Sequence, residues 1–416
     1  MILPTVTPTV RGSVSAPIPS ISAGGPLSGI FTIDGMILDE TGSDLSPYTV
    51  TQSGTSSTTL TNGLFALQDN EAASNIEIDY DVSGITDPYL VEVRMKAQAN
   101  TDFFTIAGRS AANNYESAIG FTSTAGQIRK IVDGSATNSS PAGLDKTEYV
   151  FTLLKIDPSA KKTSSLMLWE NAGESDQEQI IADESYTNPI ATFDLITGTA
   201  DTVLFNAKNY RVSTRWLLCI GDSMTAGINQ AAGKNEYDPV ESLVTIGNLN
   251  QATTWERVIE SFHVGKTSLV NIGDGGTTLA DGASQIAENL NMQCPNLDFI
   301  WVWYGNVDIG IRRLIGDMQA DWISIETACE AAGLTMVTAE SMPSQGYDAA
   351  QNTLKNDWNA WLVARCAARG HTCLAWEAEF NDGADGMKAI YVDEVAERHP
   401  NDAGKAEMAR QFETKV

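Results

Sequence analysis

Hydrophobic and polar residues follow one rhythm up to about residue 210 and a different one after it. In the first stretch, short runs rich in β-branched and aromatic residues, such as EYVFTLLKID (148–157), alternate with clusters of Gly, Asn, Asp and Ser. Such runs are typical of strands joined by turns, and helical spacing is rare among them. We therefore expect residues 31–210 to form an all-β sandwich of jelly-roll or lectin-like type.

From residue 211 onward, apolar runs alternate with segments of helical spacing. Strands are expected at 216–220, 268–273, 298–304, 334–340 and 372–376, and helices at 253–262, 280–292, 311–333, 349–370 and 401–416. This alternation implies a parallel sheet covered by helices on both faces, and so a multidomain chain. Ligands of such sheets bind beyond the carboxyl ends of the strands, so functional residues are expected there.

Residues 1–30 consist mainly of Pro, Ser, Gly and Thr, and Arg11 is their one charged residue. Such a segment cannot bury enough surface to fold alone. It is either a disordered tail or an extended arm that becomes ordered by docking on a partner. The scarcity of charges and the regular Ile, Val and Leu content support the docking arm at least as well as the disordered tail.

The net charge of −27 is spread along the whole chain, which argues against a nucleic-acid partner because phosphates would be repelled. No apolar stretch is long enough to predict a membrane span. The N-terminus lacks the basic segment and unbroken apolar run of a cleaved signal peptide. Five scattered cysteines and three histidines show no metal-ligand spacing, so no metal and no cofactor are expected.

A Gly-Asp-Ser tripeptide follows the strand expected at 216–220. Gly221, Asp222 and Ser223 are ordinary strand-to-helix turn residues, with Asp222 or Ser223 as the helix N-cap. They equally suit a nucleophilic serine held on a tight turn at the end of a parallel strand. The tripeptide alone favours neither interpretation.

Two further blocks, each at a strand end or before the last helix, change the balance. NIGDGGTT (271–278) begins at the end of the strand expected at 268–273 and continues into the turn after it, and it contains Asn271, Gly273, Gly276 and Thr278. His399-Pro400-Asn401 precedes the closing helix. Together with Gly221-Asp222-Ser223, these blocks resemble the SGNH, or GDSL, hydrolase family in residue type, order and spacing.

The resemblance implies a flavodoxin-like, three-layer α/β domain with serine esterase chemistry for residues 211–416. It makes Ser223 the nucleophile and His399 the base that takes its proton. It makes the backbone N–H groups of Ser223 and Gly276, together with an asparagine side chain, the donors to the oxyanion.

Two positions depart from the family pattern. Where the family has Gly-x-Asn-Asp, this chain has Gly305-Asn306-Val307-Asp308, so that valine, which cannot donate, occupies the asparagine position. Asn306 comes one residue early, and a small shift in the turn would bring its amide to the oxyanion.

The second departure concerns the acid of the triad. The family has Asp three residues before its histidine, and here that residue is Ala396. Asp393 is the first choice for the acid and Glu397 the second. A third alternative is a Ser–His dyad in which a backbone carbonyl orients the imidazole.

Taken together, the sequence predicts a serine esterase that removes O-acetyl groups from a host-surface or extracellular polysaccharide. The order of arm, sandwich and esterase resembles phage tail fibres, spikes or other virion decorations. That layout implies a glycan partner, other virion proteins bound through residues 1–30, a homo-oligomer such as a trimer, and an extracellular or virion location without a cleaved leader. The alternative is an SGNH fold that has lost turnover and binds glycan or serves a structural role, which Val307 and Ala396 support.

Overall fold

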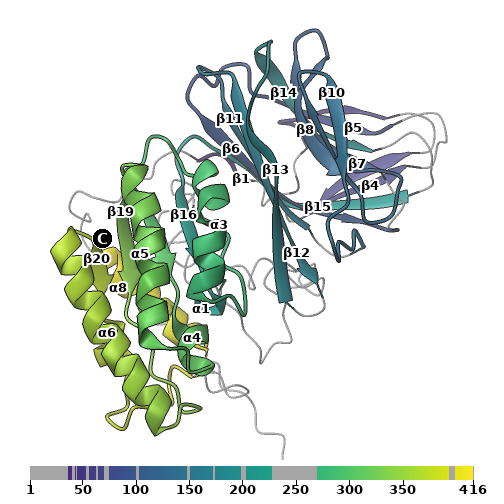
Figure 1. Cartoon of the computed structure of the whole chain (residues 1–416). Coiled ribbons are helices and arrows are strands. Elements are labelled where there is room, and N and C mark those ends of the chain that lie inside the picture. Colours follow the sequence, from purple (N-terminus) through teal and green to yellow (C-terminus); the bar gives the residue numbers. More distant parts are fainter. Residues whose placement is uncertain are drawn as a thin grey trace, which may run out of the picture.

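The computed structural model describes residues 36–226 with short gaps, 269–392 and 399–415 (Figure 1). The gaps are 40–42, 44, 53–55, 62–63, 70–74, 100–102, 148–149, 172–173 and 198–202. The arm expected at 1–30 and the helix expected at 253–262 lie outside the described residues. Among the described residues, no helix combines the length and the hydrophobicity needed to span a membrane.

Antiparallel strands form two sheets in the N-terminal part of the chain. The eight-stranded sheet contains β1 (Met36–Asp39), β3 (Ser57–Thr61), β4 (Leu64–Asp69), β6 (Tyr89–Ala97), β11 (Val150–Asp157), β12 (Lys162–Asn171), β13 (Glu174–Ser185) and β15 (Val203–Ser213). The seven-stranded sheet contains β2 (Thr49–Thr51), β5 (Glu77–Asp81), β7 (Phe104–Ser110), β8 (Tyr115–Phe121), β9 (Ile128–Val132), β10 (Ser135–Ser139) and β14 (Ile190–Thr197). Their facing side chains, including Val91, Ile106 and Leu195, share one hydrophobic core. The predicted antiparallel β-structure is confirmed, while its jelly-roll or lectin-like type stays a prediction.

The C-terminal part contains a parallel five-stranded sheet in the order β17-β16-β18-β19-β20. Its strands are β16 (Leu217–Gly221), β17 (Leu269–Asn271), β18 (Phe299–Trp303), β19 (Thr335–Ala339) and β20 (Thr372–Leu374). Numbered along the chain, this order is 2-1-3-4-5, which is the flavodoxin-like order. In such sheets the strand order reverses between the first and third strands, here β16 and β18, and ligands bind beyond their carboxyl ends.

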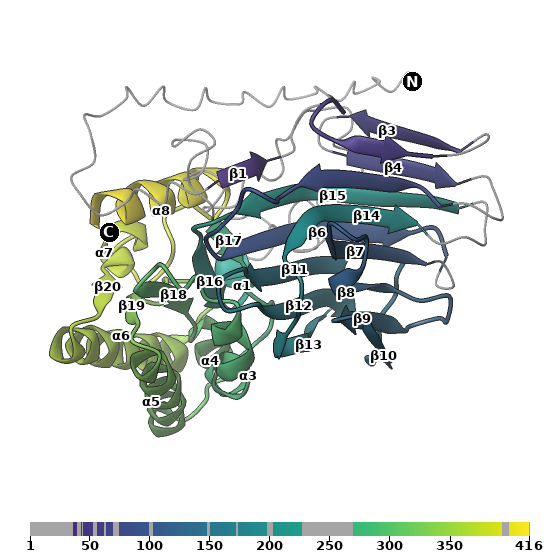
Figure 2. The same cartoon turned by 90° about the horizontal axis from the view of Figure 1, so that it is seen from above.

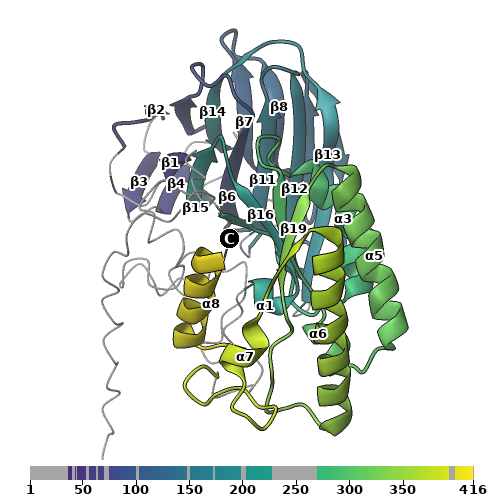
Figure 3. The same cartoon turned by 90° about the vertical axis from the view of Figure 1, so that its left-hand side faces the viewer.

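Helices cover both faces of the parallel sheet (Figure 2). The helices α3 (Leu279–Asn291), α5 (Ile315–Ala331) and α6 (Ala349–Arg369) lie on one face, and α8 (Asp402–Lys415) lies on the other. Figure 3 shows the short helices α1 (Ser223–Ala226) and α7 (Trp376–Phe380) at one end of the sheet, which is where β16 and β20 finish. A third short helix, α4 (Asn306–Gly310), follows β18.

The two parts of the chain share a continuous core. Phe151 and Leu153 of β11 belong to the same hydrophobic cluster as Trp216 and Met292, whereas the intervening Leu154 side chain lies in the sandwich core. Neighbouring residues of a strand face opposite sides of the sheet, so the eight-stranded sheet is apolar on both faces. Lys155 strengthens this contact, because its Nζ donates to the backbone oxygens of Asn291 at 2.9 Å and Gln293 at 2.8 Å.

Three predicted elements differ from their expected bounds by two residues or more, and one of them, the strand expected at 268–273, ends at Asn271. The helix expected at 311–333 begins at Ile315, because α4 ends at Gly310 and Arg312 adopts a left-handed φ of 57°. The strand expected at 372–376 ends at Leu374, and Trp376 already opens α7. Trp301 and Trp303, interpreted from the sequence as core residues, are fully buried.

Candidate active site

The turn after β16 places Ser223 at the end of a buried strand. Gly221 must be glycine, because a Cβ there would lie 2.1 Å from Thr225 Oγ1 and 2.3 Å from the backbone oxygen of Trp303. The helix α1 then begins at Ser223 itself, and the Met224 N–H donates to Asp222 Oδ1 at 2.9 Å. Asp222 therefore does satisfy a backbone donor at the start of a helix, and this capping role is compatible with chemistry at Ser223.

His399 lies within hydrogen-bond distance of Ser223. The distance from Ser223 Oγ to His399 Nε2 is 2.9 Å, although 176 residues separate the two in the sequence. The exposed fractions are 9% for Ser223 and 6% for His399, so the pair is largely shielded from solvent. A base must reach the proton that it takes, and this geometry meets that requirement.

Pro400 and Asn401 fasten the turn that carries His399. Pro400 pairs with Val392 in an isolated β-bridge. The Asn401 side chain donates to the backbone oxygens of Ile390 at 3.0 Å and Val392 at 3.1 Å, and its Oδ1 accepts from the Gly404 N–H at 3.0 Å. The last contact caps the start of α8, so this block both holds the histidine and begins the closing helix.

The second block, residues 271–278, is hydrogen-bonded directly to the first, residues 221–223. The Asp274 N–H donates to the backbone oxygen of Gly221 at 2.8 Å. Asn271 joins the two blocks as well, because its Nδ2 donates to the backbone oxygen of Thr225 at 2.7 Å. Gly276 follows on the same turn with a left-handed φ of 82°, is exposed, and has no atom within 4 Å of the place where a Cβ would stand. Its backbone thus borders open space near the first block.

The turn at 305–308, after β18, brings Asn306 against Asp222, the residue that precedes Ser223. Asp222 Oδ2 accepts from the Asn306 backbone N–H at 3.1 Å and from Asn306 Nδ2 at 3.2 Å. Val307, which spacing alone puts at the family's asparagine position, lies half-buried on α4. The structure therefore places the asparagine amide beside the Gly-Asp-Ser turn despite the shift of one residue. Its role as an oxyanion donor stays a prediction.

Asp222 and Asp308 are buried carboxylates that the sequence did not single out for a function. Burial raises the pKa of Asp222 to about 7, an effect that the hydrogen bonds from Met224 and Asn306 oppose and the nearby Asp308 carboxylate reinforces. Asp308 is bound by Arg313 at 2.8 Å and by the Leu279 N–H at 2.9 Å, and it joins α4 to the start of α3. The one signal in the sequence is position, because each lies within two residues of a predicted catalytic residue.

Both carboxylates predicted to orient His399 lie outside the described residues. Asp393, the first choice, and Glu397, the second, fall in residues 393–398, which the structure does not describe. Ala396 falls in the same stretch. The assignment of Asp393, and the dyad alternative, therefore stay predictions.

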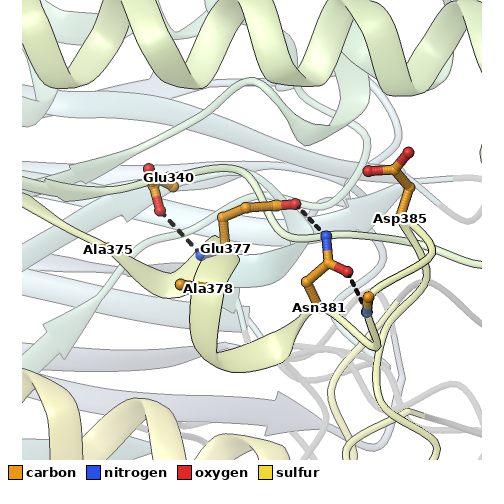
Figure 4. Close-up of a pocket in the computed structure, with 7 residues that line it drawn as sticks. Glu340, Ala375, Glu377, Ala378, Asn381 and Asp385 are labelled. Atoms are coloured by element: carbon orange, nitrogen blue, oxygen red, sulfur yellow. Dashed lines mark hydrogen bonds between the residues drawn. The ribbon is translucent and has the colours of Figure 1, made fainter.

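A hollow of about 520 Å³ opens at the same edge of the sheet, where β19 and β20 finish (Figure 4). Glu340, Glu377, Asn381 and Asp385 supply its polar walls. As Figure 4 shows, three of these residues are linked: Glu340 Oε2 accepts from the Glu377 N–H at 3.0 Å, and Asn381 Nδ2 donates to Glu377 Oε1 at 2.7 Å. Lys355 Nζ pairs with Glu377 and lies 3.9 Å from Asp385. The remaining carboxylate oxygens suit hydrogen-bond donors, such as hydroxyl groups, rather than anions.

One group of described residues elsewhere has donor atoms of metal-binding type: Glu326, Glu330 and His371. Arginines already occupy both carboxylates, since Arg365 pairs with Glu326 and Arg369 with Glu330. The group therefore reads as an ion-pair cluster that joins α5 to α6.

No protein-family model and no curated protein matches the sequence. Among solved structures, one that resembles the chain is a protein assigned to the G-D-S-L lipolytic family, from Desulfitobacterium hafniense DCB-2. The two are 16% identical over 48% of this chain and 98% of the other, with a TM-score of 0.38. A lipolytic protein of the G-D-S-L family from Veillonella parvula DSM 2008 is 18% identical over 47% and 94%, with a TM-score of 0.36. A sialidase is 12% identical over 44% of this chain and 19% of its own length, with a TM-score of 0.34. These identities and TM-scores are too low to assign a family.

Proposed function

We propose that this chain is a serine ester hydrolase of the SGNH type, with Ser223 as nucleophile and His399 as its base. The observation that carries the proposal is the 2.9 Å contact between Ser223 Oγ and His399 Nε2. It lies beyond β16, at the strand-order reversal where flavodoxin-like sheets bind their ligands. Serine is a weak nucleophile until a neighbouring base takes its proton, and His399 is placed to do so.

The reaction would run in two halves. Ser223 Oγ attacks the ester carbonyl while its proton moves to His399 Nε2, and the oxyanion accepts hydrogen bonds from the Ser223 and Gly276 N–H groups and from Asn306 Nδ2. Collapse of this intermediate breaks the ester C–O bond, and the leaving alcohol takes the proton from His399. Water then attacks the acyl-serine with His399 again as base, which releases the carboxylic acid and restores Ser223. Asp393 is the proposed orienting acid for His399.

We further propose that the ester is an O-acetyl group of a host-surface or extracellular polysaccharide. The hollow near Glu340 and Asp385 supports a hydroxyl-rich substrate, because it offers acceptors at the same edge as Ser223. The order of arm, β-sandwich and α/β part supports a place on a phage virion, outside the cell. In this proposal, residues 1–30 bind other virion proteins, and the chain assembles with copies of itself, as a trimer.

The enzyme proposal is tested with p-nitrophenyl acetate and with an O-acetylated polysaccharide whose released acetate is measured. We expect turnover in the wild type and in Ser324→Ala, which removes an exposed serine hydroxyl on α5, and none in Ser223→Ala. A folded wild type that hydrolyses neither ester, and binds glycan equally well with Ser223→Ala, would instead favour an inactive glycan-binding or structural protein.

The virion proposal needs separate measurements. Deletion of residues 1–30 is expected to release the protein from its particle and to leave esterase activity unchanged. Light scattering of the purified chain is expected to give the mass of a trimer. Retention on the particle after the deletion, or a monomeric mass, would contradict these two points without affecting the chemistry at Ser223.

A further inference from the structure

Asp222 is a fully buried carboxylate whose described hydrogen-bond partners are all donors. Its Oδ1 accepts from the Met224 N–H at 2.9 Å, and its Oδ2 accepts from the Asn306 N–H at 3.1 Å and from Asn306 Nδ2 at 3.2 Å. None of its side-chain surface reaches solvent. An arrangement of three N–H groups around two oxygens matches an ionised carboxylate, which accepts at both oxygens and donates at neither.

We propose that Asp222 is a positioning residue whose ionised form holds the Asn306 amide in the oxyanion hole, so that protonation of Asp222 weakens catalysis. This inference rests on the proposed esterase function. It adds to that function a residue that acts through Asn306 and a dependence of the site on pH.

The contacts of Asn306 show how its amide is oriented. Its Oδ1 accepts from the Met342 N–H at 3.3 Å, and its backbone oxygen accepts from the Tyr347 hydroxyl at 3.1 Å. An amide nitrogen carries two hydrogens, and one is directed at Asp222. We assign the other to the oxyanion. A proton on Asp222 Oδ2 would be repelled by the two N–H groups that donate to this oxygen. The electrostatic attraction that orients Asn306 Nδ2 would then be lost.

The surroundings of Asp222 bring its ionisation into the neutral range. Burial is the largest influence, and it raises the pKa to about 7. Asp308 of α4 reinforces this, although Arg313 pairs with that carboxylate. Tyr304 at the end of β18 faces Asp222 and Asp274 as a neutral phenol, because burial raises its pKa. His399 contacts the neighbouring Ser223. Asp222 is therefore ionised above about pH 7, and its orienting charge is lost as the pH falls through that value.

The pH profile of kcat distinguishes this role from a merely structural one. On the acid side, the wild type must lose two protons to become active, one from the base and one from Asp222, so log kcat should rise with a slope near two. In Asp222→Asn the shape is kept but one of the two side-chain oxygens becomes a donor. We expect kcat to fall about 10²- to 10³-fold, as for the loss of one oxyanion donor, with little change in KM and a slope near one.

Asp308→Asn is the matched control, because Asp308 is an equally buried carboxylate that makes no described contact with Asn306. It is expected to keep the slope of two even where it lowers stability. An Asp222→Asn variant that keeps both the wild-type kcat and the slope of two would overturn the proposal.

A second measurement does not depend on turnover. In protein labelled with ¹⁵N-asparagine, the Asn306 side-chain amide signal, assigned with Asn306→Gln, should shift with a midpoint near pH 7 in the wild type and stay constant in Asp222→Asn. If this titration is seen but no ester is hydrolysed, the esterase function fails while the coupling of Asp222 to Asn306 stands. If esters are hydrolysed through Ser223 but the amide does not titrate, the inference about Asp222 fails alone.

Discussion

Replacing Asn306 by alanine tests how the oxyanion hole is built. The side chain makes two hydrogen bonds in the structure, from Nδ2 to Asp222 and from the Met342 N–H to Oδ1. Alanine removes both of these hydrogen bonds, and with Nδ2 it removes the proposed donor to the oxyanion. The change therefore affects the transition state, the buried carboxylate of Asp222 and the free energy of unfolding.

The expected magnitudes differ for the two quantities. Loss of one oxyanion donor typically raises the barrier by about 3 kcal/mol, so kcat of Asn306→Ala should fall about 10²- to 10³-fold. Leaving the Met342 N–H and Asp222 each short of one partner should cost about 1–3 kcal/mol of unfolding free energy, towards the lower end because Asn306 is half-buried. Because Asp222 is proposed to act through this amide, its ionisation should no longer affect kcat in Asn306→Ala, and the acid limb of the pH profile should have a slope near one.

The assay combines kcat for p-nitrophenyl acetate with urea unfolding of the same preparations. Val307→Ala is the matched control and should keep kcat, and Val307→Asn should not restore activity to Asn306→Ala, because Val307 lies off the contact with Asp222. An Asn306→Ala variant that keeps wild-type kcat would refute this reasoning. A gain of activity when Val307→Asn is added to Asn306→Ala would refute it too. That result would favour position 307 as the site of the oxyanion donor, as the spacing of the family motif indicates.

Three other substitutions test different parts of the molecule. Leu153→Ala empties a buried position in the core shared by the sheet and the α/β part, and should lower the unfolding free energy by about 2–5 kcal/mol in urea titrations; no measurable loss would speak against a shared core. Burial and the facing Asp79 raise the pKa of Asp194 to about 7 from the unfolded value of 3.8, so the protonated form stabilises the fold. The unfolding free energy should therefore decline from about pH 4 to about pH 7, the range between the two pKa values, and it should decline less in Asp194→Asn; equal declines would contradict the assignment. Gly221→Ala places a Cβ 2.1 Å from Thr225 Oγ1 and should lower both the melting temperature and kcat, whereas wild-type values for both would contradict the tight turn.

The hydrophobic pattern predicts the parallel strands well, because each is short and most of their residues are apolar and buried. All five lie within a few residues of their expected positions. The pattern fails where exposed apolar residues continue a helical spacing. Ile311 and Leu314 extend the expected helix toward its N-terminus, yet they are 62% and 73% exposed and lie in the turn before α5.

The sequence does not show which part of the chain packs against the outer face of the eight-stranded sheet. Apolar residues at consecutive positions in β11 show that both faces are buried, and the pattern does not say against what. Only the fold shows that Phe151 and Leu153 face the α/β part. Contacts between distant segments depend on the path of the chain, which local periodicity does not record.

For the site, the strand-end positions of Ser223 and Gly276 could be derived from the sequence because parallel strands end at one edge of the sheet. The position of Asn306 could not be derived. Counting from Gly305 puts Val307 at the donor position, but α4 begins at Asn306, which turns this amide toward Asp222. A difference of one residue in a turn is decided by backbone angles, which spacing does not reveal.

Covalent labelling with a fluorophosphonate tests the Ser223–His399 pair most directly. The probe phosphonylates an activated serine, and peptide mass spectrometry locates the adduct. We expect a single adduct, on Ser223, which forms about 10²- to 10⁴-fold more slowly in His399→Ala and is absent in Ser223→Ala. An adduct on a different serine, or equal rates with and without His399, would contradict the assignment of Ser223 as nucleophile and His399 as its base.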